Sequence, residues 1–255
     1  MNGFQISKFR PEYMESSIEQ PMLWERHCHA QFEMIAVVRG DITLVLEGTP
    51  YRLQKNHAII IPPLLYHSVT ANEKGSYRRV TALFGLDAIP TAIQSTFLQR
   101  DRDAMIVASP TVERIGQACL EENKEFYAPL IECLIVQILY EALQEKQQRS
   151  RIDADDFLHK TLQYIDRHLH EKILLDDLAR HTARSKSSFC HLFEEKMNIS
   201  PKQYILQKKL ALAGKMIEEG VPHNVVARQL GYENYSNFYR IYLKHFGVNP
   251  TKKKP

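Results

Sequence analysis

The feature that most constrains the fold is a punctuated helical pattern near the C-terminus. One apolar-periodic run, beginning at Val225, ends at Gly231, and a second begins after Asn234 and is stopped by Gly247 and Pro250. Asparagine is a favoured helix N-cap, and glycine followed shortly by proline marks a helix end. Two short helices joined by a tight glycine turn form a helix-turn-helix, so residues 225–250 predict one.

The same pattern occurs earlier in the chain. Ala179 aligns with Ala227, and Ala183 aligns with Gly231. After one extra residue in the second turn, Ser185, Phe189, His191 and Phe193 align with Asn234, Phe238, Arg240 and Tyr242. Serine, like asparagine, caps helix N-termini. Internal repetition therefore predicts two related helix-turn-helix units in one chain.

A single long helix is expected between the two units. Ser200 is suited to the N-cap, Pro201 to the first helical position, and Gly220 to the end. The helix would span roughly 18 residues, on the order of 27 Å at 1.5 Å per residue. A rigid connector of this length can hold two recognition helices about one DNA turn apart, roughly 34 Å.

The two halves of the chain differ in charge. Residues 1–154 contain 16 Lys and Arg against 19 Asp and Glu, a balance of −3, and residues 155–255 contain 17 against 11, a balance of +6. The two balances add to the net charge of +3. A basic C-terminal half beside a mildly acidic N-terminal half favours a nucleic-acid-binding domain attached to a domain of another kind.

Residues 155–255 resemble the DNA-binding domain of the AraC/XylS-type bacterial transcription regulators. The residues that carry the resemblance are Ala227-x3-Gly231-Tyr232, Phe238-x-Arg240-x-Tyr242 and Phe246-Gly247-x-Asn249-Pro250. Three positions depart from the family pattern: Asn198 replaces a usual glycine, Lys209 replaces a usual arginine, and Lys252–Lys254 replace an aromatic-arginine ending. The resemblance implies a sequence-specific DNA-binding transcription regulator, with an operator duplex as its partner and RNA polymerase as a further candidate partner.

The outward faces of the two predicted recognition helices supply the candidate DNA-binding residues. They are Lys186, Ser187, Cys190, His191, Tyr235, Ser236, Tyr239 and Arg240. Among them Arg240 is the strongest candidate, because a guanidinium can bind guanine O6 and N7 together in the major groove. A second set is expected to contact phosphates, which sets affinity but not sequence preference: Arg180, Arg184, Lys202, Lys208 and Lys244.

The N-terminal half predicts a β domain. Short β-branched runs follow one another between residues 24 and 85, separated by the turn signals Gly40-Asp41, expected as a hairpin turn, and Glu47-Gly48. We therefore expect a two-domain α+β protein: residues 1–150 as an effector-binding and dimerisation domain, with a barrel over about 20–90 and helices over about 110–148, and residues 151–255 as an all-α domain.

Three histidines and a glutamate form the candidate site of the N-terminal domain. Period-two alternation places His27, His29, Gln31 and Glu33 on one face of a strand, and His67 follows later. The spacing His-x-His-x3-Glu-x6-Gly40 with Pro62-x4-His67 resembles the two cupin motifs, and cupin-like barrels are the usual effector domain of sugar-sensing AraC-type regulators.

Three interpretations of this cluster stay open. His27, His29, Glu33 and His67 could line a pocket for a small effector, which the resemblance suggests is a sugar. They could ligate a divalent transition metal, since imidazole suits Zn, Ni, Cu or Fe, although we expect no bound metal or cofactor. Or they could be hydrogen-bonded to one another near the barrel mouth without a ligand.

Two helices are expected after the barrel. Residues 111–123 carry apolar residues on one face, and Pro129 is expected to open a second helix over 129–143. That helix is apolar on more than one side. One side can cover the barrel, and the other either meets the same helix of a second subunit in a homodimer or is a wholly intramolecular core. Residues 144–151 are polar and predict a linker.

The remaining features limit the class of protein. The four cysteines show no CxxC or disulfide-like spacing, and the N-terminus lacks a signal-peptide core, so we expect reduced thiols and a cytoplasmic location. No apolar run reaches the roughly 20 residues that span a membrane. A regulator needs no catalytic base, so we expect no enzymatic activity. The alternatives are a metal-dependent cupin enzyme fused to a DNA-binding module, and a DNA-architectural protein without sequence preference.

Overall fold

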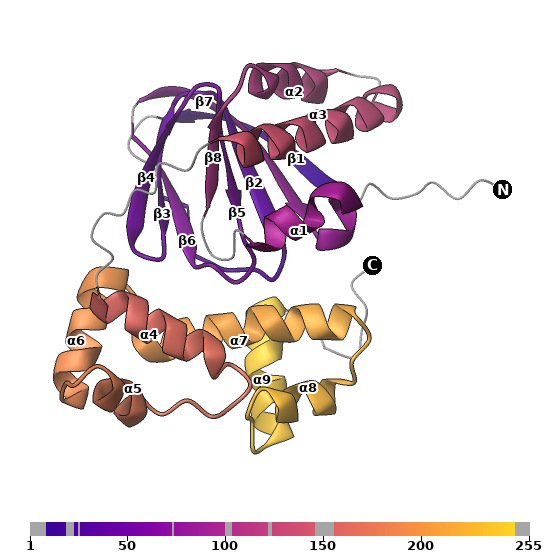
Figure 1. Ribbon diagram of the computed structural model, residues 1–255. Coiled ribbons are helices and arrows are strands. Elements are labelled where there is room, and N and C mark those ends of the chain that lie inside the picture. The colour runs from indigo at the N-terminus through magenta and orange to yellow at the C-terminus, as the bar shows by residue number, and fades with distance from the viewer. Residues whose placement is uncertain are drawn as a thin grey trace. The chain divides into compact units, whose positions relative to one another are not determined.

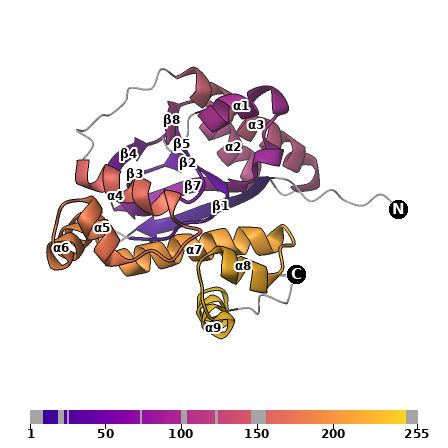
Figure 2. The same cartoon turned by 60° about the horizontal axis from the view of Figure 1, so that its bottom comes forward.

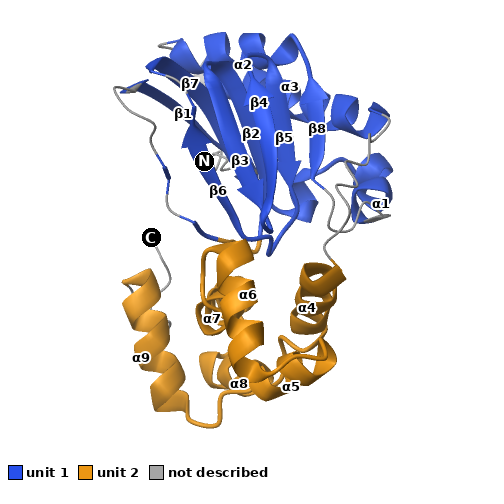
Figure 3. Cartoon of the chain, turned by 90° about the vertical axis from the view of Figure 1, so that its left-hand side faces the viewer, with its two compact units in different colours: residues 1–27, 31–149 blue, residues 28–30, 150–255 orange. Residues whose placement is uncertain are grey.

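The computed structural model describes residues 9–18, 23–24, 26–72, 74–99, 104–121, 124–145 and 156–247. By its internal contacts the chain divides into two compact units, residues 1–27 with 31–149 and residues 28–30 with 150–255 (Figure 3). Within the described ranges, no helix is long and apolar enough to cross a membrane. The predicted two-domain α+β class is confirmed. Most of the predicted linker at 144–151 and the stretch from Asn249 to Lys254 lie outside the described residues.

Unit 1 contains two antiparallel sheets. The larger has the strand order β1-β7-β2-β5-β8 and the smaller the order β4-β3-β6 (Figure 1). The strands are β1 Phe9–Ile18, β2 Phe32–Arg39, β3 Asp41–Leu46, β4 Thr49–Gln54, β5 His57–Ile61, β6 His67–Ala71, β7 Gly75–Phe84 and β8 Met105–Ala108.

The larger sheet buries both of its faces. Side chains alternate along β2 because successive residues of a strand point to opposite sides. Met34 and Ala36 enter a core that includes helical residues, whereas Ile35 and Val37 enter a second core between the two sheets. The helices are α1 Thr91–Gln99, α2 Thr111–Leu120 and α3 Lys124–Gln144.

Three expectations about unit 1 need correction. Gly40, with φ +100°, does not close a hairpin; it carries the chain from β2 in the larger sheet to β3 in the smaller one. The sheets begin with β1 at Phe9, before the expected start at about residue 20. The sequence did not predict this edge strand because it contains Pro11 and several charged residues and lacks apolar alternation. Helix α3 begins at Lys124, so Pro129 lies inside it. As the sixth residue of α3, Pro129 lies beyond the first turn, whose four N–H groups have no helical partner, so it removes one helical hydrogen bond.

Unit 2 is all helical. It contains α4 Asp156–Arg167, α5 Leu175–His181, α6 Lys186–Met197, α7 Pro201–Glu218, α8 His223–Gln229 and α9 Tyr235–Phe246. The predicted connector is confirmed as α7, which has 18 residues and is therefore about 27 Å long. Figures 1 and 2 show α5 and α6 at one end of α7, and α8 and α9 at the other.

Helix α7 is the shared core of both helix-turn-helix units. Near its start, the Tyr204 ring packs edge-on against Phe193 of α6, with centroids 5.4 Å apart. Further along, Leu210 and Ala213 join a cluster that contains Phe238 and Tyr242 of α9. Because each unit packs on the same helix, their separation along α7 is set by the fold.

Candidate DNA-binding surface and effector site

Both recognition helices begin and end as their sequences predict. The Ser185 Oγ accepts a hydrogen bond from the Ser188 backbone N–H at 3.3 Å. The Asn234 Oδ1 accepts from the N–H groups of Ser236 at 2.8 Å and Asn237 at 3.3 Å. At the far ends, Asn198 (φ 51°) and Gly247 (φ 67°) adopt the left-handed conformation that terminates a helix.

The predicted inward and outward faces of α6 and α9 are also observed. Phe189, Phe193 and Phe238 are fully buried. The exposed candidates for DNA contact, to base edges or nearby phosphates, are Lys186, Ser187, His191, Ser236 and Arg240, and the half-buried ones are Cys190, Tyr235 and Tyr239. Contact with DNA stays a prediction for all eight.

The surface of α9 differs from the prediction at two residues, Tyr235 and Asn237. The Tyr235 ring packs beside His223, with centroids 5.4 Å apart, and beside Phe238 at 6.3 Å, so part of its surface supports the fold. Asn237 was not predicted as a site residue. It is exposed in the first turn and accepts a hydrogen bond from Arg240 Nη2 at 3.5 Å. Its spacing of three residues from Arg240 could have identified it.

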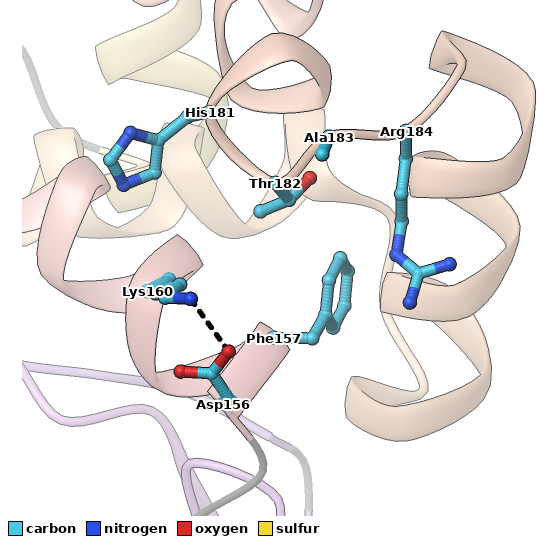
Figure 4. Close-up of a pocket in the computed structure, with 7 residues that line it drawn as sticks. All are labelled: Asp156, Phe157, Lys160, His181, Thr182, Ala183 and Arg184. Atoms are coloured by element: carbon cyan, nitrogen blue, oxygen red, sulfur yellow. Dashed lines mark hydrogen bonds and ion pairs between the residues drawn. The ribbon is translucent and has the colours of Figure 1, made fainter.

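One of the five predicted phosphate contacts is wrong. Lys208 has no exposed surface, and its Nζ donates to Asp166 Oδ1 of α4 at 2.6 Å, so this lysine holds the fold together. The other four, Arg180, Arg184, Lys202 and Lys244, are exposed. The Arg184 guanidinium lies over the Phe157 ring, 5.3 Å from its centroid (Figure 4).

A direct joint links the two helix-turn-helix units, and the sequence did not reveal it. The buried Lys209 Nζ of α7 donates to the Glu171 carbonyl, which precedes the first unit, and to the Leu230 carbonyl in the second at 2.7 Å. Burial lowers the pKa of Lys209 to about 8. Two carbonyl acceptors can still be satisfied by a neutral amine, which keeps two N–H donors.

Gly231 brings the same two segments into close contact. A Cβ at this position would lie 2.5 Å from the Glu171 carbonyl carbon and 2.6 Å from the Lys172 nitrogen. Its φ of +73° is also left-handed. The aligned Ala183 has φ +54°, so the first turn has the same conformation but accommodates a side chain. An exposed ion pair between Lys172 and Glu233 at 2.7 Å crosses the same joint and lowers the pKa of Glu233.

The four candidate effector residues come together. One ligand atom from each of His27, His29, Glu33 and His67 lies within 4.8 Å of the others. Glu33 comes from β2 in the larger sheet and His67 from β6 in the smaller one. His27 is placed beside His67 by an antiparallel bridge, with backbone hydrogen bonds of 3.0 and 2.9 Å. The expectation of one continuous strand from His27 to Glu33 is wrong, because β2 begins at Phe32.

The orientation of His67 suits a ligand-binding imidazole. Its Nδ1 lies 2.8 Å from the Leu65 carbonyl oxygen, so this nitrogen carries the proton and donates. Its Nε2 then faces Glu33 Oε2 at 2.9 Å, with the imidazole 1% exposed. Histidines that bind metals characteristically donate their second N–H in this way. The residues present therefore fit a divalent transition ion, with three nitrogen ligands and one oxygen ligand.

Arg79 of unit 1 lies against two aromatic rings. The Arg79 guanidinium lies 4.8 Å from the Trp24 ring centroid and 5.9 Å from that of Tyr77. Tyr77 is buried between the sheets, and burial raises its pKa. Tyr77 and Arg79 are two residues apart on β7 and so share a face. That alternation could have identified them as candidates.

A duplicated helix-turn-helix unit and a separate sheet domain with converging histidines define a DNA-binding transcription regulator that carries a ligand-binding domain. Residues 20–162 match the AraC-like ligand binding domain, and residues 178–254 match a helix-turn-helix domain. The chain belongs to the AraC family of transcription regulators.

Two relatives agree with this assignment. The probable transcriptional regulator LumQ of Photobacterium leiognathi is 32% identical over 245 residues, covering 95% of this chain and 96% of that protein. The uncharacterized HTH-type transcriptional regulator YobQ of Bacillus subtilis is 26% identical over 232 residues, covering 89% and 88%. Both are regulators, as expected for a chain that is not an enzyme. Among solved structures, ToxT from Vibrio cholerae aligns over 96% of both chains, with a TM-score of 0.43 and 11% identity.

Proposed function

We propose that this regulator binds a specific operator through α6 and α9 and changes its operator affinity when an effector occupies the site of His27, His29, Glu33 and His67. The convergence of these four side chains carries the proposal, because it joins both sheets at one point of the ligand-binding domain. A cytoplasmic location follows from an operator as the target. RNA polymerase remains a candidate partner by family resemblance.

The chemistry of the four donors favours a divalent transition ion as the ligand or as part of it. Donor atoms within 4.8 Å of one another surround a space suited to one ion, with the second nitrogen of His67 already bonded to a backbone carbonyl. A sugar is the other effector class, and it rests on family resemblance alone. Its hydroxyl groups could be bound by the same polar atoms or by Arg79 beside Trp24.

Metal binding is tested on the full chain after treatment with a chelator. Zn²⁺ or Ni²⁺ at about 100 times its Kd should stabilise the folded state by about 2.7 kcal/mol, which raises the unfolding midpoint. His67→Ala should abolish the rise and the bound-metal stoichiometry measured by elemental analysis, whereas His57→Ala, outside the cluster on β5, should retain both.

A panel of pentoses and hexoses in the same assay tests the second effector class. Stabilisation by a sugar that is lost in His67→Ala supports the proposed site without a metal. If neither metals nor sugars shift the midpoint, or if a shift survives in His67→Ala, the effector site lies elsewhere.

Sequence-specific binding is tested at Arg240. Arg240→Ala should cost about 1–3 kcal/mol at one base position if the guanidinium reads a base edge. Binding is measured on duplexes that differ by single base pairs, starting from a duplex selected from a random library by the wild-type chain. Lys244→Ala is the control, since loss of a phosphate contact weakens all duplexes equally. An equal loss of affinity for all duplexes in Arg240→Ala would show that Arg240 contacts phosphate and not a base edge.

We also propose that the exposed face of α3 contacts α3 of a second subunit in a homodimer. The residues of that face recur at intervals of three and four along the helix: Leu130, Cys133, Gln137, Tyr140 and Gln144. Leu130 and Tyr140 are 37% and 53% exposed, so this stripe presents apolar surface that the same stripe of a second subunit could cover. Sedimentation of the full chain measures the oligomeric state directly, and a monomer at micromolar concentration would reject the contact.

A further inference from the structure

A cleft of about 600 Å³ lies between the two helix-turn-helix units of unit 2. Its walls come from the segment that leads into α5, from the start of α6, from α7 and from the turn between α8 and α9. Its floor is apolar and includes Ile205, Leu206 and Leu230. The cleft is therefore a feature of the joint between the two units.

The rim of the cleft is charged in a paired arrangement. Lys172 Nζ lies 2.7 Å from Glu233 Oε1, and Lys186 Nζ lies 2.9 Å from Asp176 Oδ2. All four side chains are more than half exposed. Lys202, also on the rim, is exposed. Exposed ion pairs are weak, typically about 0–1 kcal/mol, so the two lysines can leave their acids at little cost.

The position of the cleft relates it to DNA. Lys186 is the first residue of α6, and Asn234 and Asn237 lie at the start of α9, so the starts of both recognition helices border it. Two recognition helices that enter successive major grooves on one side of a duplex are about one turn apart, roughly 34 Å. The sugar-phosphate strands that flank the intervening minor groove must then pass between them.

We propose that this cleft receives the DNA backbone between the two half-sites, and that Lys172 and Lys186 exchange Glu233 and Asp176 for phosphate oxygens there. The proposal rests on the proposed operator binding. Phosphates offer the lysines charge-assisted hydrogen bonds of the same kind as the carboxylates, and binding to DNA in addition releases condensed counterions, which favours the exchange. The acids then face the backbone without these lysines, so they limit affinity, and when DNA is absent they offset two of the positive charges on the rim.

The proposal predicts opposite effects for the two members of each pair. Lys172→Gln and Lys186→Gln should each reduce the slope of log K against log salt by about 0.9, the value for one phosphate contact. Glu233→Gln and Asp176→Asn should raise affinity about two- to tenfold at low salt, because each removes a negative charge that faces the backbone. Base preferences should not change in any of the four.

The measurement is fluorescence anisotropy of the full chain with the library-selected duplex over a series of salt concentrations. Lys160→Gln and Lys215→Gln are matched controls, since each lysine forms an exposed ion pair away from the cleft, with Asp156 and Glu219. Their salt slopes should equal that of the wild type. Circular dichroism confirms that every variant is folded.

Two results would overturn the proposal. One is a wild-type salt slope for both Lys172→Gln and Lys186→Gln, which would leave the cleft to another occupant, such as a protein segment. The other is weaker binding by Glu233→Gln and Asp176→Asn, which would make the ion pairs supports of the bound conformation. Failure of operator binding itself is distinguished by the wild-type chain, which would then select no sequence from the library.

Discussion

Gly231→Ala is expected to lower the unfolding midpoint of the DNA-binding unit more than substitution at the exposed turn glycines Gly220 and Gly247. A Cβ in the left-handed region costs about 1–2 kcal/mol. Overpacking adds typically about 1–3 kcal/mol, and here the obstructing atoms are backbone, at 2.5–2.9 Å from the new Cβ. A total of about 2–5 kcal/mol corresponds to a midpoint decrease of about 8 °C or more in a unit of this size.

The same substitution should weaken binding to a duplex that carries both half-sites. The segment at Glu171 and Lys172 would be pushed from the second unit, so the two recognition helices would lose their fixed separation. Gly247→Ala is the matched control, because Gly247 has φ +67° and, apart from its chain neighbours, no described residue has a heavy atom within 4 Å of the position that a Cβ would take. Equal losses in the two variants would show that conformation alone, without the close contact at Glu171, determines the effect.

The helical unit could be predicted from sequence in most respects because its signals are local. N-caps at Ser185, Ser200 and Asn234 act within one helical turn, and a 3.6-residue period identifies the buried face. Ala183 adopts the left-handed conformation of Gly231, with which it aligns. Contacts between distant segments left no such signal. The bonds from Lys209 to two carbonyls join residues that only the folded chain brings together.

The sheet unit was less predictable because pairing partners are not encoded locally. A glycine turn between two β-branched runs predicts a hairpin, yet the two strands beside Gly40 belong to different sheets. The cluster of His27, His29, Glu33 and His67 was nevertheless anticipated. The candidates were identified by residue type, since histidine and glutamate side chains suit a polar or metal site. Alternation along one strand was expected to bring His27 into the site, but an isolated bridge to His67 does so instead.

Lys208 shows where charge alone misleads, and its substitution has the second large effect we expect. Lys208→Ala should destabilise the DNA-binding unit by about 3 kcal/mol, the low end for a broken buried ion pair, because Lys208 is fully buried and its partner Asp166 is 24% exposed. The Lys208 Nζ also lies 5.0 Å from the ring centroid of Tyr204 on the same helix, so this cation–π contact is lost with it. Lys208→Met combined with Asp166→Asn should recover much of the loss, since both charges are then removed.

Chemical unfolding followed by circular dichroism measures this effect in the helical unit, whereas fluorescence of the single Trp24 reports on unit 1. Lys202→Ala, an exposed position on the same helix, is the control: its stability should stay within about 0.5 kcal/mol of the wild type. Its salt slope for DNA binding should fall, while that of Lys208→Met should not. A Lys208→Met variant with wild-type stability and a reduced salt slope would reverse the assignment and return Lys208 to the phosphate contacts.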